Sequence, residues 1–167
     1  ELRTPLNSLL ILSKLLADNP QGNLNEKQTE FARTINSAGS DLLNLINDIL
    51  DLSKIESGKL DLEMIPFDLL SVIEETLDVF VPQVERKGLE LGYLFASDTP
   101  HTIVGDPNRL RQLLTNLVGN AVKFTSKGEI VIRVDSRLEE GNHRLHFAVS
   151  DTGIGIAKDK QRLIFEA

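Results

Sequence analysis

Residues 25–57 read NEKQTEFARTINSAGSDLLNLINDILDLSKIES and contain no proline and a single glycine, Gly39. Apolar residues recur along this segment at alternating spacings of four and three: Phe31, Ile35, Ala38, Leu42, Leu45, Ile49 and Leu52. This repeat predicts one long helix with a heptad seam. Asn25, with Gln28 three positions later, is typical of a helix start, and Ser57-Gly58 of a helix end.

A second, shorter helix is expected before it, because leucines recur throughout residues 1–18. The breaker cluster Asp-Asn-Pro-Gln-Gly-Asn at 18–23 separates the two segments, which predicts an antiparallel helical hairpin. Leu43, Ile46 and Leu50 widen the apolar stripe beyond a two-stranded seam. A lone hairpin cannot bury both faces, so we expect a homodimer that completes a four-helix bundle. The alternative is a hairpin that packs on the rest of its own chain.

The remainder of the chain mixes helical and strand patterns. Strands are expected at 60–66, 89–95, 102–104, 129–138 and 144–150, and helices at 68–87 and 106–125. Pro82 predicts a kink or an early end of the first of these helices, whereas Asp106 and Pro107 are typical of the start of the second. The pattern predicts an α+β unit, a sandwich with helices on one face of a mixed sheet.

Composition excludes several classes of function. The 167 residues contain no cysteine, which excludes a disulfide framework, a thiolate metal site and a cysteine nucleophile. The net charge is −7 and neither half of the chain is basic, so we expect no nucleic-acid partner. No stretch approaches the roughly 20 apolar residues of a membrane span, so we expect no membrane contact by this segment.

The segment Asn116–Thr125 (NLVGNAVKFT) carries polar side chains in an apolar helix pattern. Asn116, Asn120 and Lys123 are spaced i, i+4 and i+7, which places them on one helical face. An amide oxygen is a hard ligand suited to Mg²⁺, and a lysine is suited to phosphate. The alternative is an ordinary solvated face.

The segment Asp151–Ile156 (DTGIGI) follows an expected strand. Glycines two positions apart let a backbone approach a ligand closely, and a carboxylate at a strand end can accept a hydrogen bond from an exocyclic amine such as that of adenine. The alternative is a tight turn in which Asp151 is a local cap. The sequence has neither a Walker A nor a Gly-x-Gly-x-x-Gly pattern, so any nucleotide site must be of another type.

These segments together resemble the transmitter region of sensor histidine kinases, over essentially the whole chain. Glu1–Asn7 (ELRTPLN) resembles the end of their H-box, Asn116–Thr125 their N-box, Asp151–Ile156 their G1-box, and Leu163–Glu166 (LIFE) the start of their F-box. The hairpin is also similar to that of hybrid kinases, which carry a receiver domain further along the chain.

The resemblance implies a dimerisation and phosphoacceptor hairpin at 1–57, a linker at 58–67, and a Bergerat-type ATP-binding domain at 68–167. It implies that Asn120 ligates Mg²⁺ and that Asp151 recognises adenine. The other implied nucleotide-binding residues are Asn116 and Lys123 near the phosphates, Phe124 near the nucleotide, and Gly153 and Gly155 in the turn.

The implied reaction moves the γ-phosphoryl group of ATP to a histidine and then to an aspartate of a response-regulator receiver domain. In this family Glu1 would be the base or orienter of the histidine, and Thr4 would position water when the regulator is dephosphorylated. The regulator would dock near Ser8, Ile11, Leu12 and Leu15. Without the resemblance, Glu1 and Thr4 would be taken as solvated polar residues. We expect this segment to be cytoplasmic, in a parent protein that is either membrane-anchored or not.

The chain departs from the family pattern at both ends. The family's acceptor histidine would immediately precede Glu1, and its glycine-rich G2-box and last strands would follow Ala167. We therefore expect a fragment that cannot phosphorylate itself and binds ATP weakly. Two other classes compete: a non-catalytic dimerisation scaffold, and an ATPase of the gyrase or chaperone kind, which would lack the segment Glu1–Asn7.

Overall fold

The structure is a computed structural model that describes residues 3–163. The chain divides into two compact units, Glu1–Asp61 and Leu62–Ala167, each of which is described by itself. Within residues 3–163, every helix is too short or too polar to cross a membrane.

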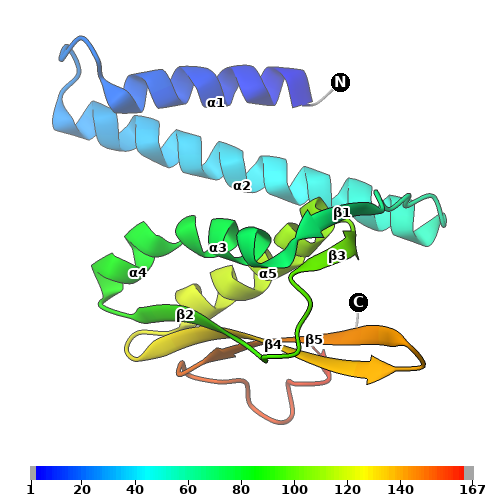
Figure 1. Cartoon of the computed structure of the whole chain (residues 1–167). Coiled ribbons are helices and arrows are strands. Elements are labelled where there is room, and N and C mark those ends of the chain that lie inside the picture. Colours follow the sequence, from blue (N-terminus) through cyan, green and yellow to red (C-terminus); the bar gives the residue numbers. More distant parts are fainter. Residues whose placement is uncertain (1–2, 164–167) are drawn as a thin grey trace. The chain divides into compact units, whose positions relative to one another are not determined.

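The first unit is a hairpin of two antiparallel helices, α1 (Arg3–Asp18) and α2 (Glu26–Glu56) (Figure 1). The expected capping box opens α2: the Gln28 N–H donates to the Asn25 side chain over 2.9 Å, and the Asn25 N–H donates to the Gln28 side chain over 3.0 Å. Ser57 is the C-cap, and Gly58 adopts a left-handed φ of 64° that turns the chain out of the helix.

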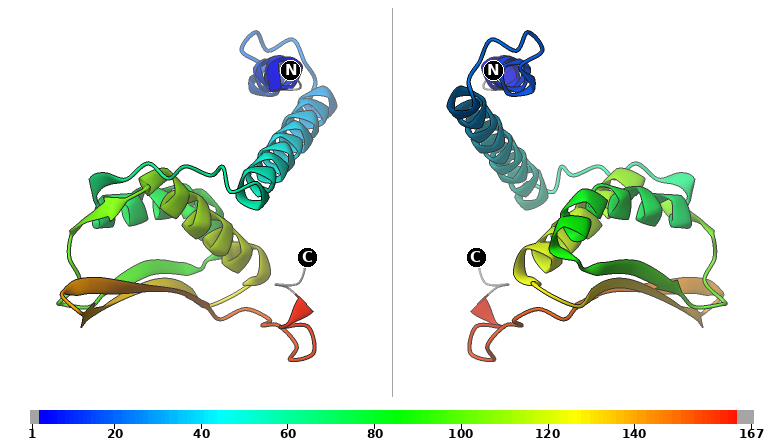
Figure 2. Two further views of the ribbon diagram at one scale, coloured as in Figure 1. Left: turned by 90° about the vertical axis from the view of Figure 1, so that its right-hand side faces the viewer. Right: turned by 90° about the vertical axis from the view of Figure 1, so that its left-hand side faces the viewer.

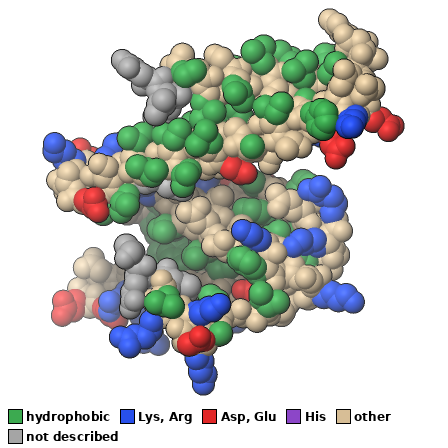
Figure 3. All heavy atoms as spheres, turned by 180° about the vertical axis from the view of Figure 1, so that it is seen from behind, with side chains coloured by type: hydrophobic (Ala, Val, Ile, Leu, Met, Phe, Trp, Pro, Cys, Tyr) green, Lys and Arg blue, Asp and Glu red, His purple; other side chains and the backbone are tan. Residues whose placement is uncertain are grey.

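Small side chains make the contact between the two helices. Ala32 and Gly39 of α2 are buried, as is Leu6 of α1. A Cβ at Gly39 would lie 2.9 Å from the Cδ2 atom of Leu10, so a larger residue would require the Leu10 side chain to shift. The heptad seam of α2 points elsewhere, and all of its members are exposed: Phe31, Ile35, Ala38, Leu42, Leu45, Ile49 and Leu52. Figure 3 shows hydrophobic side chains spread over the surface of the hairpin.

The second unit has two layers, with α3 (Leu69–Asp78), α4 (Val81–Lys87) and α5 (Pro107–Phe124) on one face of a sheet (Figures 1 and 2). The sheet is mixed: β2 (Glu90–Phe95) runs parallel to β4 (Glu129–Glu139), which pairs antiparallel with β5 (Asn142–Asp151). A separate antiparallel pair is formed by β1 (Ile65–Asp68) and β3 (Thr102–Gly105). The predicted architecture, a hairpin followed by an α/β unit, is confirmed.

The core of this unit lies between the helices and the sheet. Alternate residues of β4 are fully buried against the helices: Ile130, Ile132 and Val134. The helices contribute buried side chains at helical spacing: Leu69, Ile73, Leu77, Leu114, Val118, Ala121 and Val122.

Two expected elements differ from the structure. The strand expected at 60–66 is β1 at Ile65–Asp68, because its partner β3 offers only four residues for pairing. The helix expected at 68–87 is two helices that break at Val79–Phe80, and Pro82 lies in the first turn of α4. Proline is tolerated there because first-turn N–H groups have no acceptor within the helix.

Candidate functional site

The start of α5 is fixed by Asp106, whose Oδ1 accepts the backbone N–H groups of Asn108 and Arg109, both over 3.0 Å. The Arg109 N–H, followed by the Glu63 N–H, holds the pKa of the Asp106 carboxyl below its usual value. Because one face of α5 is buried, its rotation is fixed. Asn116, Asn120 and Lys123 consequently lie exposed on its other side.

The last turn of α5 presents a cation and an aromatic ring. The Lys123 Nζ lies 5.3 Å from the centroid of the Phe124 ring, which is 48% exposed. Lys123 and Phe124 follow Asn120 by three and four positions, which is about one helical turn. An amide, an ammonium group and an apolar ring are therefore available to a ligand at this end of the helix.

The end of β5 meets this end of α5 at Asp151. Asp151 Oδ1 accepts the Gly153 N–H over 2.8 Å and the Thr125 hydroxyl over 3.4 Å. The Ile154 N–H donates to the Phe124 carbonyl over 3.4 Å. Within residues 3–163 no donor contacts Asp151 Oδ2, so this carboxylate oxygen is available to a ligand.

Gly153 and Gly155 are required by the turn in different ways. A Cβ at Gly153 would lie 2.6 Å from the Phe124 carbonyl oxygen and 2.9 Å from Thr125 Oγ1, so any side chain would push the turn away from α5. Gly155 has a left-handed φ of 65°, a conformation that residues other than glycine rarely adopt.

Other expected site residues are not part of this constellation. Thr4 belongs to α1 in the first unit, where its carbonyl accepts the Ser8 hydroxyl over 3.2 Å. Glu1 and residues 164–166 lie outside the described residues. Sequence reasoning assigned no role to Thr125, although it ends the segment Asn116–Thr125, and it missed Lys87, which contacts α5 from a distant place in the chain.

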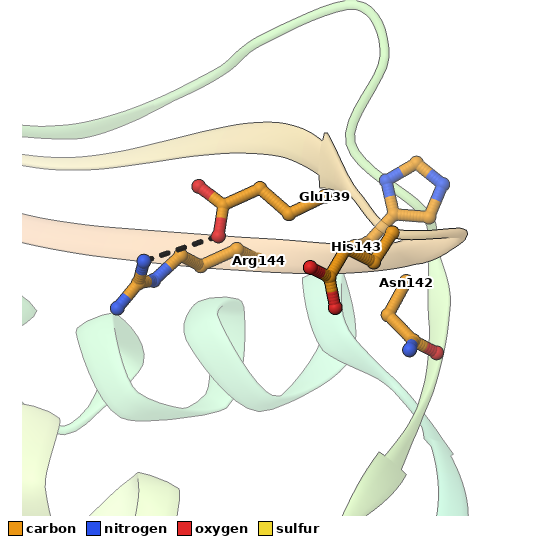
Figure 4. Close-up of a pocket in the computed structure, with 5 residues that line it drawn as sticks. Glu139, Asn142, His143 and Arg144 are labelled. Atoms are coloured by element: carbon orange, nitrogen blue, oxygen red, sulfur yellow. Dashed lines mark hydrogen bonds and ion pairs between the residues drawn. The ribbon is translucent and has the colours of Figure 1, made fainter.

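A hollow of about 700 Å³ lies at the β4–β5 turn and is separate from the site at Asp151. It is lined by Glu139, Glu140, Asn142, His143 and Arg144, and Figure 4 shows the exposed Arg144–Glu139 ion pair at its edge. β5 begins at Asn142 and ends at Asp151, so the hollow is roughly 30 Å from the Asp151 turn. Exposed pairs of this kind add little stability, and none of the expected site residues lies here.

The side chains at the end of α5 suit a nucleotide with its metal. Within residues 3–163 no group of three or more His, Asp or Glu could enclose a metal ion by itself. Mg²⁺ binds nucleotides through few protein ligands and keeps phosphate and water oxygens around it. An Asn120 amide oxygen beside phosphates supplies a fitting ligand of this kind.

An asparagine-bearing helix that ends against an Asp-x-Gly-x-Gly turn, in a two-layer α/β unit, is typical of the ATPase domain shared by histidine kinases, gyrase and chaperones. Residues 105–167 match the family "Histidine kinase-, DNA gyrase B-, and HSP90-like ATPase". Residues 1–58 match "His Kinase A (phospho-acceptor) domain". The chain therefore belongs to the histidine kinase family and corresponds to its transmitter region.

Relatives support this assignment along the whole chain. Sensor histidine kinase GacS of Pseudomonas protegens is 45% identical over 100% of this chain, which spans 18% of that protein. Full-length ShkA, solved in complex with AMPPNP, has a TM-score of 0.77 at 34% identity over 99% of this chain and 34% of its own. Histidine kinase ThkA, solved in complex with response regulator TrrA, shares the fold with a TM-score of 0.57 at 19% identity, over 98% of this chain and 47% of its own.

Proposed function

We propose that this chain is the core of a sensor histidine kinase that transfers the γ-phosphoryl group of ATP to a histidine and then to an aspartate of a response-regulator receiver domain. One observation carries the proposal: the Asp151 turn and the end of α5 meet through Thr125 and Phe124, in a chain that also contains a phospho-acceptor hairpin.

Each side chain at this junction has a distinct role in binding. Asp151 Oδ2 accepts a hydrogen bond from the exocyclic amine of adenine, and Phe124 offers an apolar surface beside the base. Lys123 and Asn116 contact phosphate oxygens, and Asn120 ligates Mg²⁺. The metal supplies charge neutralisation on the phosphates, which is the main catalytic need of phosphoryl transfer.

The hairpin would supply the dimer contact and the residue that orients the phosphorylated histidine of the full-length protein. Its exposed heptad seam is apolar, with Phe31 55% and Leu45 56% exposed, and a second copy would cover it in a four-helix bundle. A neutral imidazole is already nucleophilic near pH 7 and needs chiefly orientation, which we assign to Glu1. Thr4, three positions after Glu1 in the sequence, would position water for dephosphorylation of the regulator.

The regulator would dock on α1. Ile11 and Leu15 are spaced i, i+4 and are both exposed, as are Ser8 and Leu12. An apolar strip of this kind is suited to a partner's apolar surface rather than to water.

The chain itself is not expected to accept the phosphoryl group. Residues 1–58, which match the phospho-acceptor domain, contain no histidine. His101, His143 and His146 belong to the second unit, and the His143 ring nitrogen bonds to the Ser136 hydroxyl over 2.8 Å. No label should therefore appear on the 167-residue chain after incubation with γ-labelled Mg-ATP.

Nucleotide binding tests the site directly. We expect NMR titration of the chain with Mg-ATP, carried to millimolar concentration, to shift the amide signals of Thr125 and Gly153. Asp151→Asn should weaken ATP binding at least about tenfold, because it replaces a carboxylate, which only accepts hydrogen bonds, with an amide that also donates. Asp159→Asn, at an exposed carboxylate, should not weaken binding. Absence of shifts in the unmodified chain would contradict the proposal.

A further inference from the structure

Every backbone carbonyl in the last turn of α5 has a hydrogen-bond donor, although helix ends usually leave four such groups without one. The Thr125 N–H donates to Ala121 O over 3.0 Å, and the Ile154 N–H donates to Phe124 O over 3.4 Å. The two carbonyls between them, Val122 O and Lys123 O, accept from one side chain, Lys87 Nζ, over 2.5 and 3.4 Å.

Lys87 takes the place of an ordinary C-terminal cap. Helices commonly end at a glycine in the left-handed conformation, whose N–H groups reach back to the last carbonyls. α5 instead ends at Thr125, which is extended with φ −102° and ψ 127°. The ammonium group of Lys87 also donates to Thr125 O over 3.2 Å, and a cation is favoured at the negative end of a helix dipole.

Thr125 links this cap to Asp151, the carboxylate proposed to bind the base. Its backbone carbonyl is held by Lys87, and its hydroxyl donates to Asp151 Oδ1. The Thr125 side chain is fully buried, so its hydroxyl has little freedom to turn elsewhere. With Oδ1 bound by Thr125 and by the Gly153 N–H, the carboxylate is fixed with Oδ2 left for a ligand.

We infer that Lys87 and Thr125 are positioning residues for adenine selection: Lys87 fixes the end of α5, and Thr125 passes that constraint to the Asp151 carboxylate. The inference rests on the proposed function, because it requires Asp151 to read the exocyclic amine. It assigns a functional role to a lysine that lies on another helix, α4, and contacts only backbone carbonyls at the end of α5.

The test compares ATP with purine riboside triphosphate, which lacks the exocyclic amine, by NMR titration of the chain. The measured quantity is the ratio of their dissociation constants. Thr125→Val removes the hydroxyl and keeps the shape, whereas Thr125→Ser keeps the hydroxyl. Lys87→Met removes the ammonium group and keeps the stem, whereas Lys87→Arg keeps a cationic donor.

We expect Thr125→Val and Lys87→Met to lower the preference for ATP by about five- to tenfold, and the serine and arginine variants to retain it. A residue that merely stabilised the fold would weaken both nucleotides equally and leave the ratio unchanged. Because Thr125 is buried, Lys87→Met, at an exposed side chain, provides an independent variant should the valine variant fail to fold.

Two results would overturn the inference, and they can be told apart. If the unmodified chain prefers ATP, Asp151→Asn abolishes the preference, and folded Lys87→Met leaves the ratio unchanged, then the inference is wrong and the proposed function stands. If the unmodified chain shows no preference for ATP, the proposed function fails together with the inference.

Discussion

The two units of this chain contain similar apolar residues but use them in opposite ways. In the second unit, Leu62–Ala167, which we call the ATPase unit, leucines, isoleucines and valines from helices and strands form one buried core. In the hairpin the described buried apolar side chains are only Leu6 and Ala32, while the heptad seam is exposed. The difference teaches that one unit encloses its own apolar core, whereas the other leaves large apolar side chains exposed and suited to an interface.

Geometry explains the contrast. A sheet with helices on one face encloses a core between two layers. Two helices alone can bury only a narrow strip of each helix, and here the strip is filled by small residues around Gly39. The larger side chains then lie outside, where a second hairpin can cover them.

The largest effect is expected at the exposed heptad seam of α2. We expect Leu45→Asp to raise the dimer dissociation constant roughly a thousandfold, because two carboxylates, one from each copy, would enter an apolar seam. Asn44→Asp, at a neighbouring exposed position, is the matched control and should leave the dimer intact. Analytical ultracentrifugation measures both. A monomeric unmodified chain at high micromolar concentration would contradict the interface.

The core can be tested with two adjacent leucines of α5. Leu114 is 1% exposed and Leu113 is 61% exposed. We expect Leu114→Ala to lower the free energy of unfolding of the ATPase unit by about 3 kcal/mol, because it leaves a cavity, and Leu113→Ala by about 0.5 kcal/mol or less. Urea denaturation followed by signals of each unit would measure this. Equal losses of unfolding free energy in the two variants would contradict the orientation of α5, in which Leu114 faces the core and Leu113 faces solvent.

A smaller effect is expected inside the hairpin. The Asn36 side chain donates to Leu10 O and to Ser13 Oγ, both over 2.9 Å. Asn36→Ala should lower hairpin stability by about 1 kcal/mol, since these bonds are partly buried, and Ser37→Ala on the exposed side should change it little. Thermal unfolding of the two variants side by side measures both effects. A larger loss of stability from Ser37→Ala than from Asn36→Ala would contradict the packing of Asn36 against α1.

The caps of α5 and α2 should differ slightly in how their contribution to stability depends on pH. The pKa of the α5 cap, Asp106, is lowered in the folded state by backbone N–H donors, so its stabilising contribution is present above the unfolded pKa of about 3.9 and is lost as pH falls through the lower folded value. Asn25, the α2 cap, is an amide and does not titrate.

Asp106→Asn should therefore reduce the loss of ATPase-unit stability between pH 5 and pH 2, measured by urea denaturation. Asp78→Asn, at an exposed carboxylate at the end of α3, serves as the control. An unchanged pH profile in Asp106→Asn would show that the cap contributes nothing to acid sensitivity.

The elements with strong local signals could be predicted from the sequence. Asp106-Pro107 marked the start of α5, and the Asn25–Gln28 pair marked the start of α2. In each case the decisive interaction spans only a few residues. Local chemistry therefore determines the element.

The features that depend on distant partners could not be predicted. The extent of β1 depends on β3, almost 40 positions later, and the capping of α5 by Lys87 joins residues 35 apart in the sequence. Periodicity identified the heptad seam, but not which side of α2 would meet α1. The side that meets α1 contains Gly39, whose missing side chain leaves room for Leu10.

The most direct test of the account is phosphorylation of the full-length protein that contains this chain. It would be incubated with Mg²⁺ and γ-labelled ATP, alongside an Asn120→Ala variant and a Ser126→Ala control at an exposed position just beyond α5. We expect acid-labile, base-stable label in the unmodified protein and the control, and none in folded Asn120→Ala. Absence of label from a folded dimer that still binds ATP would contradict a kinase and indicate a docking scaffold instead.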